Sequence, residues 1–427
     1  MQHFSLQLEA LSPLAIRADH APGGVENAAY ISGTTLLGSL AALHRLAHPG
    51  ATSTFERLFL SGQVYYPDLY PASFTNDDFK GASDLPVYPL PKTAQSCKRF
   101  PGFLPLTDEE VDEKRHGVRD SLLDWAVFTL GGQADPSIDA ATLLKPFHEE
   151  GRKNCPACKR PMDRFSGYYR RRDSDGQLAK AEAETRLQTR TGINRATGTV
   201  QESILYSRQV FEEHTRFWGM LHVEDELAQS LQQFISEIGT SGLVRIGTGR
   251  SRGMGKAHLS LTEITVGEQG RFDHFKQRVA ELDTKLHDRV KDAFGPLKLK
   301  PLYFAVTLHS PVIAYDELLR YRGVIDKQML EEMLQLPADT LKLEYQNAST
   351  QQVRGWNELW GMPRTREVAI ETGSVFLFSS EVASHEAKKA FMEALFKLEE
   401  AGIGRRKAEG FGRICVSDPF HLEETLK

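Results

Sequence analysis

Apolar and polar residues alternate along residues 2–10, where Phe4, Leu6 and Leu8 stand between polar neighbours. This period of two predicts a half-buried β-strand. From Tyr30 to Ala47 the apolar residues recur at spacings of three and four, which predicts an amphipathic helix. Both patterns return in the second half of the chain, where the predicted strands are 301–310 and 375–378 and the predicted helix is 383–401. Helices and strands are therefore mixed along the chain.

Two stretches rich in glycine and arginine interrupt this pattern, over 239–256 and 402–413. Each follows an amphipathic helical run and leads into an alternating, strand-like run. Glycine adopts positive φ without steric cost and lets a polyanion approach the main chain. Successive backbone N–H groups then form an anion-binding concavity, and arginines add charge and planar stacking surfaces. The RNA-binding residues that we expect here are Arg245, Gly247, Gly249, Arg250, Arg252, Gly253, Lys256, Arg405 and Arg406.

The first stretch contains GTGRSRG, which fits the GxGxxG pattern of dinucleotide-binding proteins superficially. That motif should follow a strand and open a helix, whereas here the order is reversed, so we reject the dinucleotide interpretation. A solvated, flexible loop is the alternative for either copy taken alone. Two copies at equivalent places favour a shared function.

The order of the elements predicts an α+β chain built from two ferredoxin-like domains. The expected parts are a first domain over 1–265, with a proline-rich irregular insertion over about 65–175 and a hairpin over about 186–210, a helical connector over 266–300, and a second domain over 301–427. The first strand of each domain is followed by a similar segment, SPLAI at 12–16 and SPVIA at 310–314. This weak internal repeat is consistent with duplicated domains.

Further arginines and tyrosines suit single-stranded RNA, which proteins hold by stacking bases on aromatic or guanidinium planes and by contacting phosphates. Those that we add to the expected RNA-binding residues are Arg17 in the turn after the first strand, Tyr168, Tyr169, Arg170 and Arg171 in SGYYRRR, and Arg186, Arg190 and Arg195 on the hairpin. The alternative is a structural hairpin whose arginines form surface ion pairs.

Cys155 and Cys158 have the C-x-x-C spacing of a zinc knuckle, and Cys97 lies upstream in a similarly irregular stretch. With His116 as the fourth ligand, or His148 in its place, they predict a closed structural zinc site that would hold the insertion together. Unliganded or redox-active thiols are the alternative, although no βαβ pattern surrounds the motif. Cys415, in the last predicted strand, is expected to be a small core residue.

Composition limits the remaining possibilities. The 427 residues carry a net charge of −5, so a basic surface must be local. We find no signal-peptide pattern and no apolar run long enough to span a bilayer. With only four cysteines, we expect a cytoplasmic protein with reduced thiols rather than a disulfide scaffold.

Taken together, these features resemble the RAMP superfamily of CRISPR-associated proteins. The matching segments are YISGTTLLGSLA, TRTGINRATGTVQESILYSRQVF and the two glycine-rich stretches. SCKRF, HGVRDSLLDW, NCPAC and SGYYRR look more particularly like the RAMP subunit of type III-D effector complexes. The resemblance implies a subunit that binds CRISPR RNA (crRNA), holds its 5′ repeat-derived tag, and assembles with backbone RAMP subunits and a large subunit. We match nothing over 315–365.

Some relatives cleave repeat RNA with a histidine, and others cleave target RNA with a loop aspartate. Asp19 and His20 follow the first strand, where such residues could lie, but nothing near them supplies a paired general acid and base. We therefore expect a non-catalytic subunit. The alternatives are a metal-independent endoribonuclease that processes repeat RNA, and a protein–protein adaptor without RNA contact.

Overall fold

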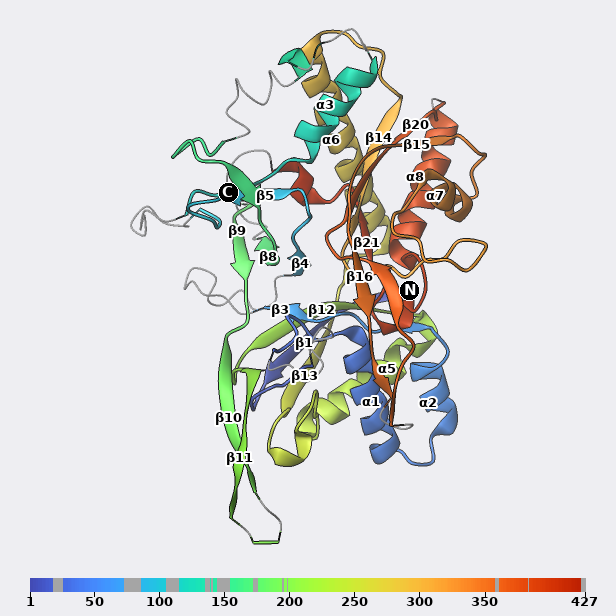
Figure 1. Ribbon diagram of the computed structural model, residues 1–427. Helices are drawn as coiled ribbons and strands as arrows, with labels where there is room; N and C mark the ends of the chain where they lie inside the picture. The colour runs from blue at the N-terminus through green and yellow to red at the C-terminus, as the bar shows by residue number, and fades with distance from the viewer. Residues whose placement is uncertain are drawn as a thin grey trace.

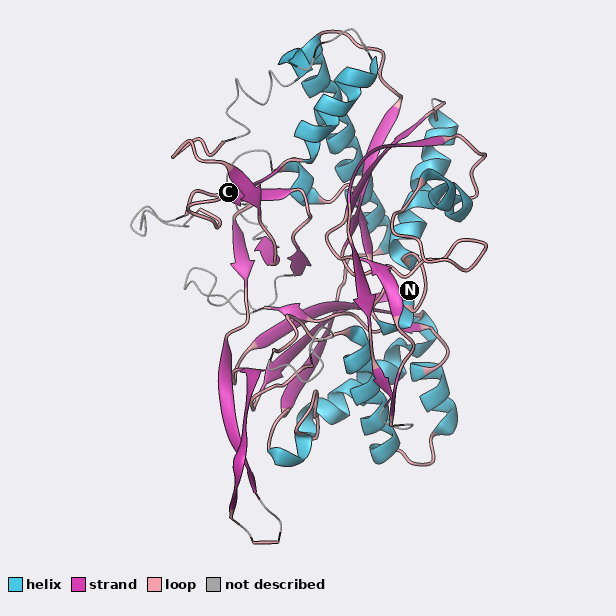
Figure 2. Ribbon diagram, in the orientation of Figure 1, coloured by secondary structure: helices cyan, strands magenta, loops and turns pink. Residues whose placement is uncertain are grey.

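The computed structural model describes the chain except for residues 18–25, 73–85, 105–114, 135–138, 140, 144–153, 172–175, 194, 195, 198, 358–360, 383 and 424–427. Its helices are α1 (Gly33–Ala47), α2 (Thr52–Phe59), α3 (Leu122–Ala134), α5 (Asp225–Ser241), α6 (Glu268–Phe294), α7 (Lys327–Leu334) and α8 (His385–Ala401), with 3₁₀ turns η3 (Arg250–Arg252), η4 (Lys407–Glu409) and η5 (Pro419–Leu422). Its strands are β1 (Gln2–Ala10), β2 (Val64–Tyr65), β3 (Tyr70–Pro71), β4 (Val87–Pro89), β5 (Ala94–Cys97), β6 (Val118–Asp120), β7 (Met162–Arg164), β8 (Tyr168–Arg171), β9 (Leu178–Ala181), β10 (Thr185–Ile193), β11 (Val200–Phe211), β12 (Arg216–Val223), β13 (Ala257–Glu263), β14 (Leu302–Leu308), β15 (Leu341–Asn347), β16 (Thr350–Val353), β17 (Trp356–Asn357), β18 (Met362–Pro363), β19 (Glu367–Ile370), β20 (Val375–Ser380) and β21 (Ile414–Val416). Figure 2 shows that helices and strands are mixed throughout, so the α+β prediction is confirmed. No helix in the described part of the chain is long and apolar enough to cross a membrane.

The first unit is an antiparallel sheet with the order β13-β1-β12-β2, in which β3 also pairs with β12. The alternation that the sequence shows along β1 points Phe4, Leu6 and Leu8 into the core, where all three are buried. Leu36 of α1 and Leu231 of α5 pack into the same core. These helices and α2 cover one face of the sheet (Figure 1).

The second unit is a sheet with the order β15-β20-β14-β21, and its central strands are buried on both faces. Phe304 and Phe378 pack on one side with α7 and α8. Tyr303 and Leu377 pack on the other side with α3 and α6. The expected connector is therefore more than a linker, because α6 also covers the second sheet (Figure 1).

The insertion forms two small sheets, with the orders β4-β8-β9 and β6-β5-β7, and it also supplies α3. Its buried Lys92 extends to the second unit, where the ammonium pairs with Glu371 at 2.5 Å and donates to Ser349. His421, from the C-terminal segment, donates from Nδ1 to Asp120 Oδ2 at 2.9 Å. These contacts fix the insertion against the second unit.

Each unit carries a two-stranded ribbon between its second and third sheet strands. In the first unit this is β10–β11, close to the expected 186–210, and it projects away from the rest of the molecule (Figure 1). In the second unit it is β16–β19, continued by β17–β18. Strands β16, β17 and β18 fall in 315–365, where we match no family segment, and β19 lies just beyond that range.

Candidate nucleic-acid interface and metal cluster

The pairing register of β10 and β11 separates the ribbon into two different faces. Arg186 is opposite Val210, Gln188 is opposite Arg208, and Arg190 is opposite Tyr206. Because alternate residues of a strand point to opposite sides, the three arginines and the tyrosine share one face. Leu187, Thr189, Thr191, Leu205 and Ser207 form the other face.

The basic face of the ribbon meets the first glycine-rich loop. Arg252 Nη1 donates to Tyr206 Oη at 2.8 Å, and Arg208 Nη1 donates to Thr248 Oγ1 at 3.1 Å. We call Arg190, Tyr206, Arg208, Arg250 and Arg252 the hairpin–loop surface. At the root of the ribbon, Arg186 pairs with Glu213 at 2.9 Å, as the ion-pair alternative expects.

The hairpin–loop surface keeps much of its positive charge. Within the described residues, no carboxylate lies at ion-pair distance from Arg190, Arg208, Arg252 or Lys256. Gly249 and Gly253 flank η3 in the left-handed conformation, with φ of 76° and 79°, so the turn between them needs glycine. Arg245 is half-buried, and its Nη1 donates to the carbonyls of Gly242 and Val244 at 3.0 and 3.2 Å rather than joining this surface.

The second glycine-rich loop does not form an equivalent surface. Arg406 pairs with Glu367 at 2.5 Å and with Glu409 at 2.7 Å. Arg405 lies over the ring of Tyr315 at 5.0 Å and remains exposed. We therefore keep Arg405 as an RNA-binding candidate and leave Arg406 out.

The tyrosine–arginine segment also lies differently from the expectation. Tyr169 and Arg170 are buried, with 3% and 0% exposure, so neither can stack on a base in this structure. Tyr168 packs on Tyr70 with ring centroids 4.7 Å apart, and Arg171 pairs with Glu423 at 3.3 Å. We leave this segment out of the proposed RNA surface, because β8 is an interior strand of the insertion.

Of the remaining candidate residues, the structure describes Arg17 only. Arg17 is exposed, and its backbone bridges to Asn27. Asp19, His20, His148 and Arg195 lie outside the described residues.

Cys97, His116, Cys155 and Cys158 come together in the insertion, and their ligand atoms all lie within 4.8 Å of one another. Cys97 Sγ is 3.4 Å from Cys158 Sγ, and His116 Nδ1 is 3.2 Å from Cys155 Sγ. In a zinc tetrahedron with bonds of about 2.0–2.3 Å, neighbouring donors lie about 3.5 Å apart. The donor set and its separations therefore fit a metal ion.

The strands explain how residues so distant in sequence form this cluster. Cys97 ends β5, which pairs with β7 directly after the C-x-x-C turn. That turn is closed by Lys159 N donating to Cys155 O at 2.8 Å and Cys155 N donating to Arg160 O at 2.7 Å. His116 N donates to Phe100 O at 3.0 Å and so lies beside the same strand.

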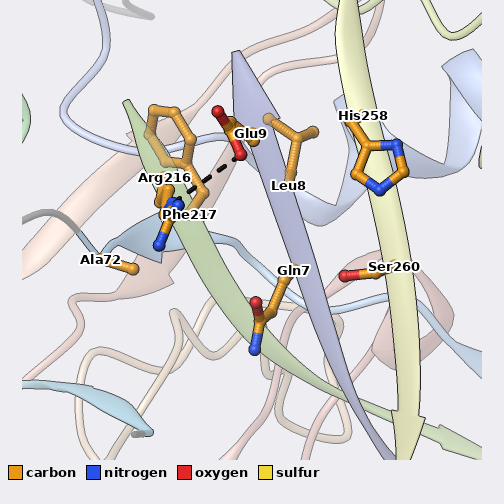
Figure 3. A pocket seen from close by; sticks show the side chains of 8 residues that line it. All are labelled: Gln7, Leu8, Glu9, Ala72, Arg216, Phe217, His258 and Ser260. Atoms are coloured by element: carbon orange, nitrogen blue, oxygen red, sulfur yellow. Dashed lines mark ion pairs between the residues drawn. The ribbon is translucent and has the colours of Figure 1, made fainter. Parts of the chain in front are cut away.

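The face of the first sheet away from its helices, part of which packs against the insertion, holds a hollow lined in part by Gln7, Glu9, Arg216, His258 and Ser260 (Figure 3). Glu9 lies 3.8 Å from Arg216, which offsets its charge. The hollow offers hydrogen-bonding groups without an excess of positive charge. Phosphate binding is therefore better placed on the hairpin–loop surface.

Sequence reasoning missed Tyr206 and Arg208. Both lie in the predicted hairpin, but the predicted RNA-binding residues there were only Arg186, Arg190 and Arg195, on the first arm and in the turn. The signal was available, because a hairpin register places residues of the second arm opposite Arg190 and Gln188.

The fold and this surface define an α+β protein with a local basic face on a projecting ribbon. The chain belongs to the RAMP superfamily, whose family model matches residues 7–258. The predicted membership is confirmed.

Three solved structures illustrate the likeness to distant chains. A chain of the Type III-B Cmr-beta complex bound to cognate target RNA is 11% identical, with 92% of this chain and 94% of that chain covered and a TM-score of 0.37. A chain of a Cas6 product complex is 9% identical, with 97% of this chain and 99% of that chain covered and a TM-score of 0.38. Oligomeric Cmr4 from Pyrococcus furiosus is 14% identical, with 62% of this chain and 100% of that chain covered and a TM-score of 0.27. No curated protein matches the chain.

Proposed function

We propose that this chain is a crRNA-binding subunit of a type III, III-D-like CRISPR effector complex. It holds the 5′ repeat-derived tag of the guide and assembles in the cytoplasm with backbone RAMP subunits and a large subunit for antiviral defence. The observation that carries the RNA-binding part is the hairpin–loop surface, where Arg190 and Arg208 of the ribbon converge with Arg252 of the loop. None of these three arginines has a carboxylate at ion-pair distance among the described residues. Membership of the RAMP superfamily supports the wider assignment.

The surface suits single-stranded RNA for three physical reasons. Guanidinium groups contact phosphates and stack on bases, Tyr206 offers an aromatic plane, and the glycine loop allows the RNA to approach main-chain N–H groups. The net charge of −5 keeps the rest of the molecule from attracting nucleic acid unspecifically.

An Arg208→Ala/Arg252→Ala variant tests this proposal. We expect about a tenfold or greater loss of affinity for crRNA at low salt, and a slope of log K against log salt that is smaller by about 1.4, as for two lost contacts to a single strand. The control is Arg57→Ala/Lys276→Ala, which removes two exposed cations that pair with Glu226 and Asp273. Equal binding by both variants would contradict the proposal.

We propose that the subunit does not cleave RNA. Pure protein incubated with repeat RNA should leave it intact, and cleavage that His20→Ala abolishes would favour the endoribonuclease instead. The adaptor alternative predicts no RNA affinity in the wild type.

We propose that both units are ferredoxin-like domains. Their sheet orders, β13-β1-β12-β2 and β15-β20-β14-β21, are the same when strands are numbered within each unit. In both, helices follow the first and the third sheet strands, which is the order of the β-α-β-β-α-β motif.

We propose that the cysteine–histidine cluster holds a structural zinc ion. Elemental analysis should give one zinc per chain, and Cys155→Ser/Cys158→Ser should lose it and unfold at lower temperature, because metal binding contributes to folding. Cys415→Ser is the matched control, since Cys415 lies outside the cluster and should keep the zinc.

A further inference from the structure

The segment that joins β14 to α7 contains a tightly closed turn. The backbones of Tyr315 and Tyr321 form a bridge, and their rings lie 4.7 Å apart. Inside this closure, Asp316 Oδ1 accepts from the backbone N–H groups of Leu318 and Arg320 at 3.0 and 2.9 Å. The turn is therefore an ordered element rather than a loose connection.

The turn presents two leucines to solvent. Leu318 and Leu319 are 72% and 71% exposed. Leu319 also has a φ of 59°, in the left-handed region that is unfavourable for a residue with a Cβ. Glycine would relieve this strain, and a polar residue would avoid the exposed apolar surface. The fold itself gains nothing from leucine at either position.

The surroundings of the leucines have the composition of a protein interface. Tyr321 is 38% exposed, and the exposed Arg366 and Arg405 lie on segments that contact the two tyrosines. Tyrosine and arginine are enriched in interface cores, whereas lysine is depleted. Arg320 pairs with Asp316 and Arg322 pairs with Asp326, both at 2.7 Å, whereas no carboxylate among the described residues lies at ion-pair distance from Arg366.

We propose that Leu318 and Leu319 insert into an apolar cleft of a different protein chain, and that carboxylates on the rim of this cleft face Arg366. Aliphatic side chains offer neither charge for phosphates nor a π-face for bases, so RNA is the less suitable occupant. This docking surface is distinct from the hairpin–loop surface and does not depend on RNA binding there.

Photo-crosslinking of the full chain tests the proposal. A benzophenone amino acid is placed at position 319, the protein is expressed in its own host and purified after nuclease treatment, and the crosslinked peptide is mapped. We expect a peptide of another protein with apolar residues flanked by Asp or Glu. A crosslink to RNA or to a second copy of this chain, or no crosslink beyond that from the equally exposed Leu46 position, would overturn the proposal.

Variants then test the mapped contact. Leu318→Ser/Leu319→Ser should lower recovery of the crosslinked partner at least tenfold, whereas Leu46→Ser and Leu60→Ser should not. Leu319→Gly should lower recovery while leaving the thermal stability equal or higher, because it relieves the positive φ. Arg366→Glu should also weaken recovery, and reversal of the facing carboxylate to lysine should restore it. Unchanged recovery with the leucine variants would refute the docking surface even if a crosslink formed.

Discussion

The glycine-rich loops of the two units are held by equivalent hydrogen bonds. Ile246 N donates to Gly255 O at 2.8 Å, and Ile403 N donates to Gly412 O at the same distance. The segments after the first strands repeat this match, since Gly255 N donates to Pro13 O and Gly412 N to Pro311 O, both at 2.9 Å. The segments SPLAI and SPVIA therefore have the same structural role in the two units, because each accepts a hydrogen bond from the glycine-rich loop.

The surroundings of the two loops differ sharply. The first loop lies beside the projecting ribbon, where Arg252 contacts Tyr206. The second loop packs between the units, where Tyr66 N donates to Ala408 O at 3.2 Å. At the position equivalent to Arg252, counted from the shared glycines, the second loop has Glu409, which binds Arg364 and Arg406 at 2.7 Å. One backbone design therefore supports an exposed cationic surface in one unit and an internally neutralised contact in the other.

The largest expected difference between the two loops is in the loss of stability when a glycine is replaced by alanine. Gly410 and Gly253 end the two 3₁₀ turns, with φ of 96° and 79°. A Cβ at Gly410 would lie 2.9 Å from Asp68 Oδ1 and 3.1 Å from Tyr66 O, whereas a Cβ at Gly253 would meet nothing within 4 Å. We expect Gly410→Ala to lower the free energy of unfolding by about 2–4 kcal/mol, through backbone strain and overpacking together. Gly253→Ala should cost about 1–2 kcal/mol, through strain alone.

Chemical denaturation of both variants measures this difference. Equal losses would mean that the second loop is not packed between the units as described. Gly62→Ala serves as a control for strain in open space, since Gly62 has a φ of 77° and no atom within 4 Å of its Cβ position.

The next difference is the pH dependence that Glu409 contributes. Although burial opposes it, hydrogen bonds from Arg406 and Arg364 lower the pKa of Glu409 to about 2. Because the folded pKa lies below the ordinary value of 4.5, this stabilisation is fully present above about pH 4.5 and is lost as the pH falls towards 2. We expect Glu409→Gln to cost about 1–2 kcal/mol at pH 7, after discounting for solvent screening, and less at pH 3.

Thermal unfolding of wild type and Glu409→Gln between pH 7 and pH 3 checks this expectation. The two curves should converge as the pH falls. Parallel curves would show that Glu409 is not the titrating group.

The sequence predicted local features better than their environments. The glycine loops, the hairpin and the Cys155–Cys158 pair follow from local spacing and residue type. Cys97 and His116 were proposed from residue type alone, with His148 as the alternative to His116. Burial of Tyr169 and Arg170 depends on the packing of β8 inside the insertion, which spacing alone does not reveal. Neutralisation of Arg406 could be predicted in part, because Glu409 is three residues away. Its second partner, Glu367, is 39 residues away and comes from β19 of the second ribbon, which spacing does not reveal.

The smallest expected effect on stability comes from giving the first loop the charge of the second. Arg252→Glu should change the free energy of unfolding by no more than about 0.5 kcal/mol, because the side chain is exposed and donates to the single phenolic oxygen of Tyr206. Its affinity for crRNA should nevertheless fall more than that of Arg252→Lys, which keeps the charge but loses the planar donor array. Thermal unfolding and RNA titration of the two variants separate these effects. A large loss of stability in Arg252→Glu would show that Arg252 supports the fold. The difference between Arg252 and Glu409 would then be one of packing, and Arg252 would not be kept for RNA binding.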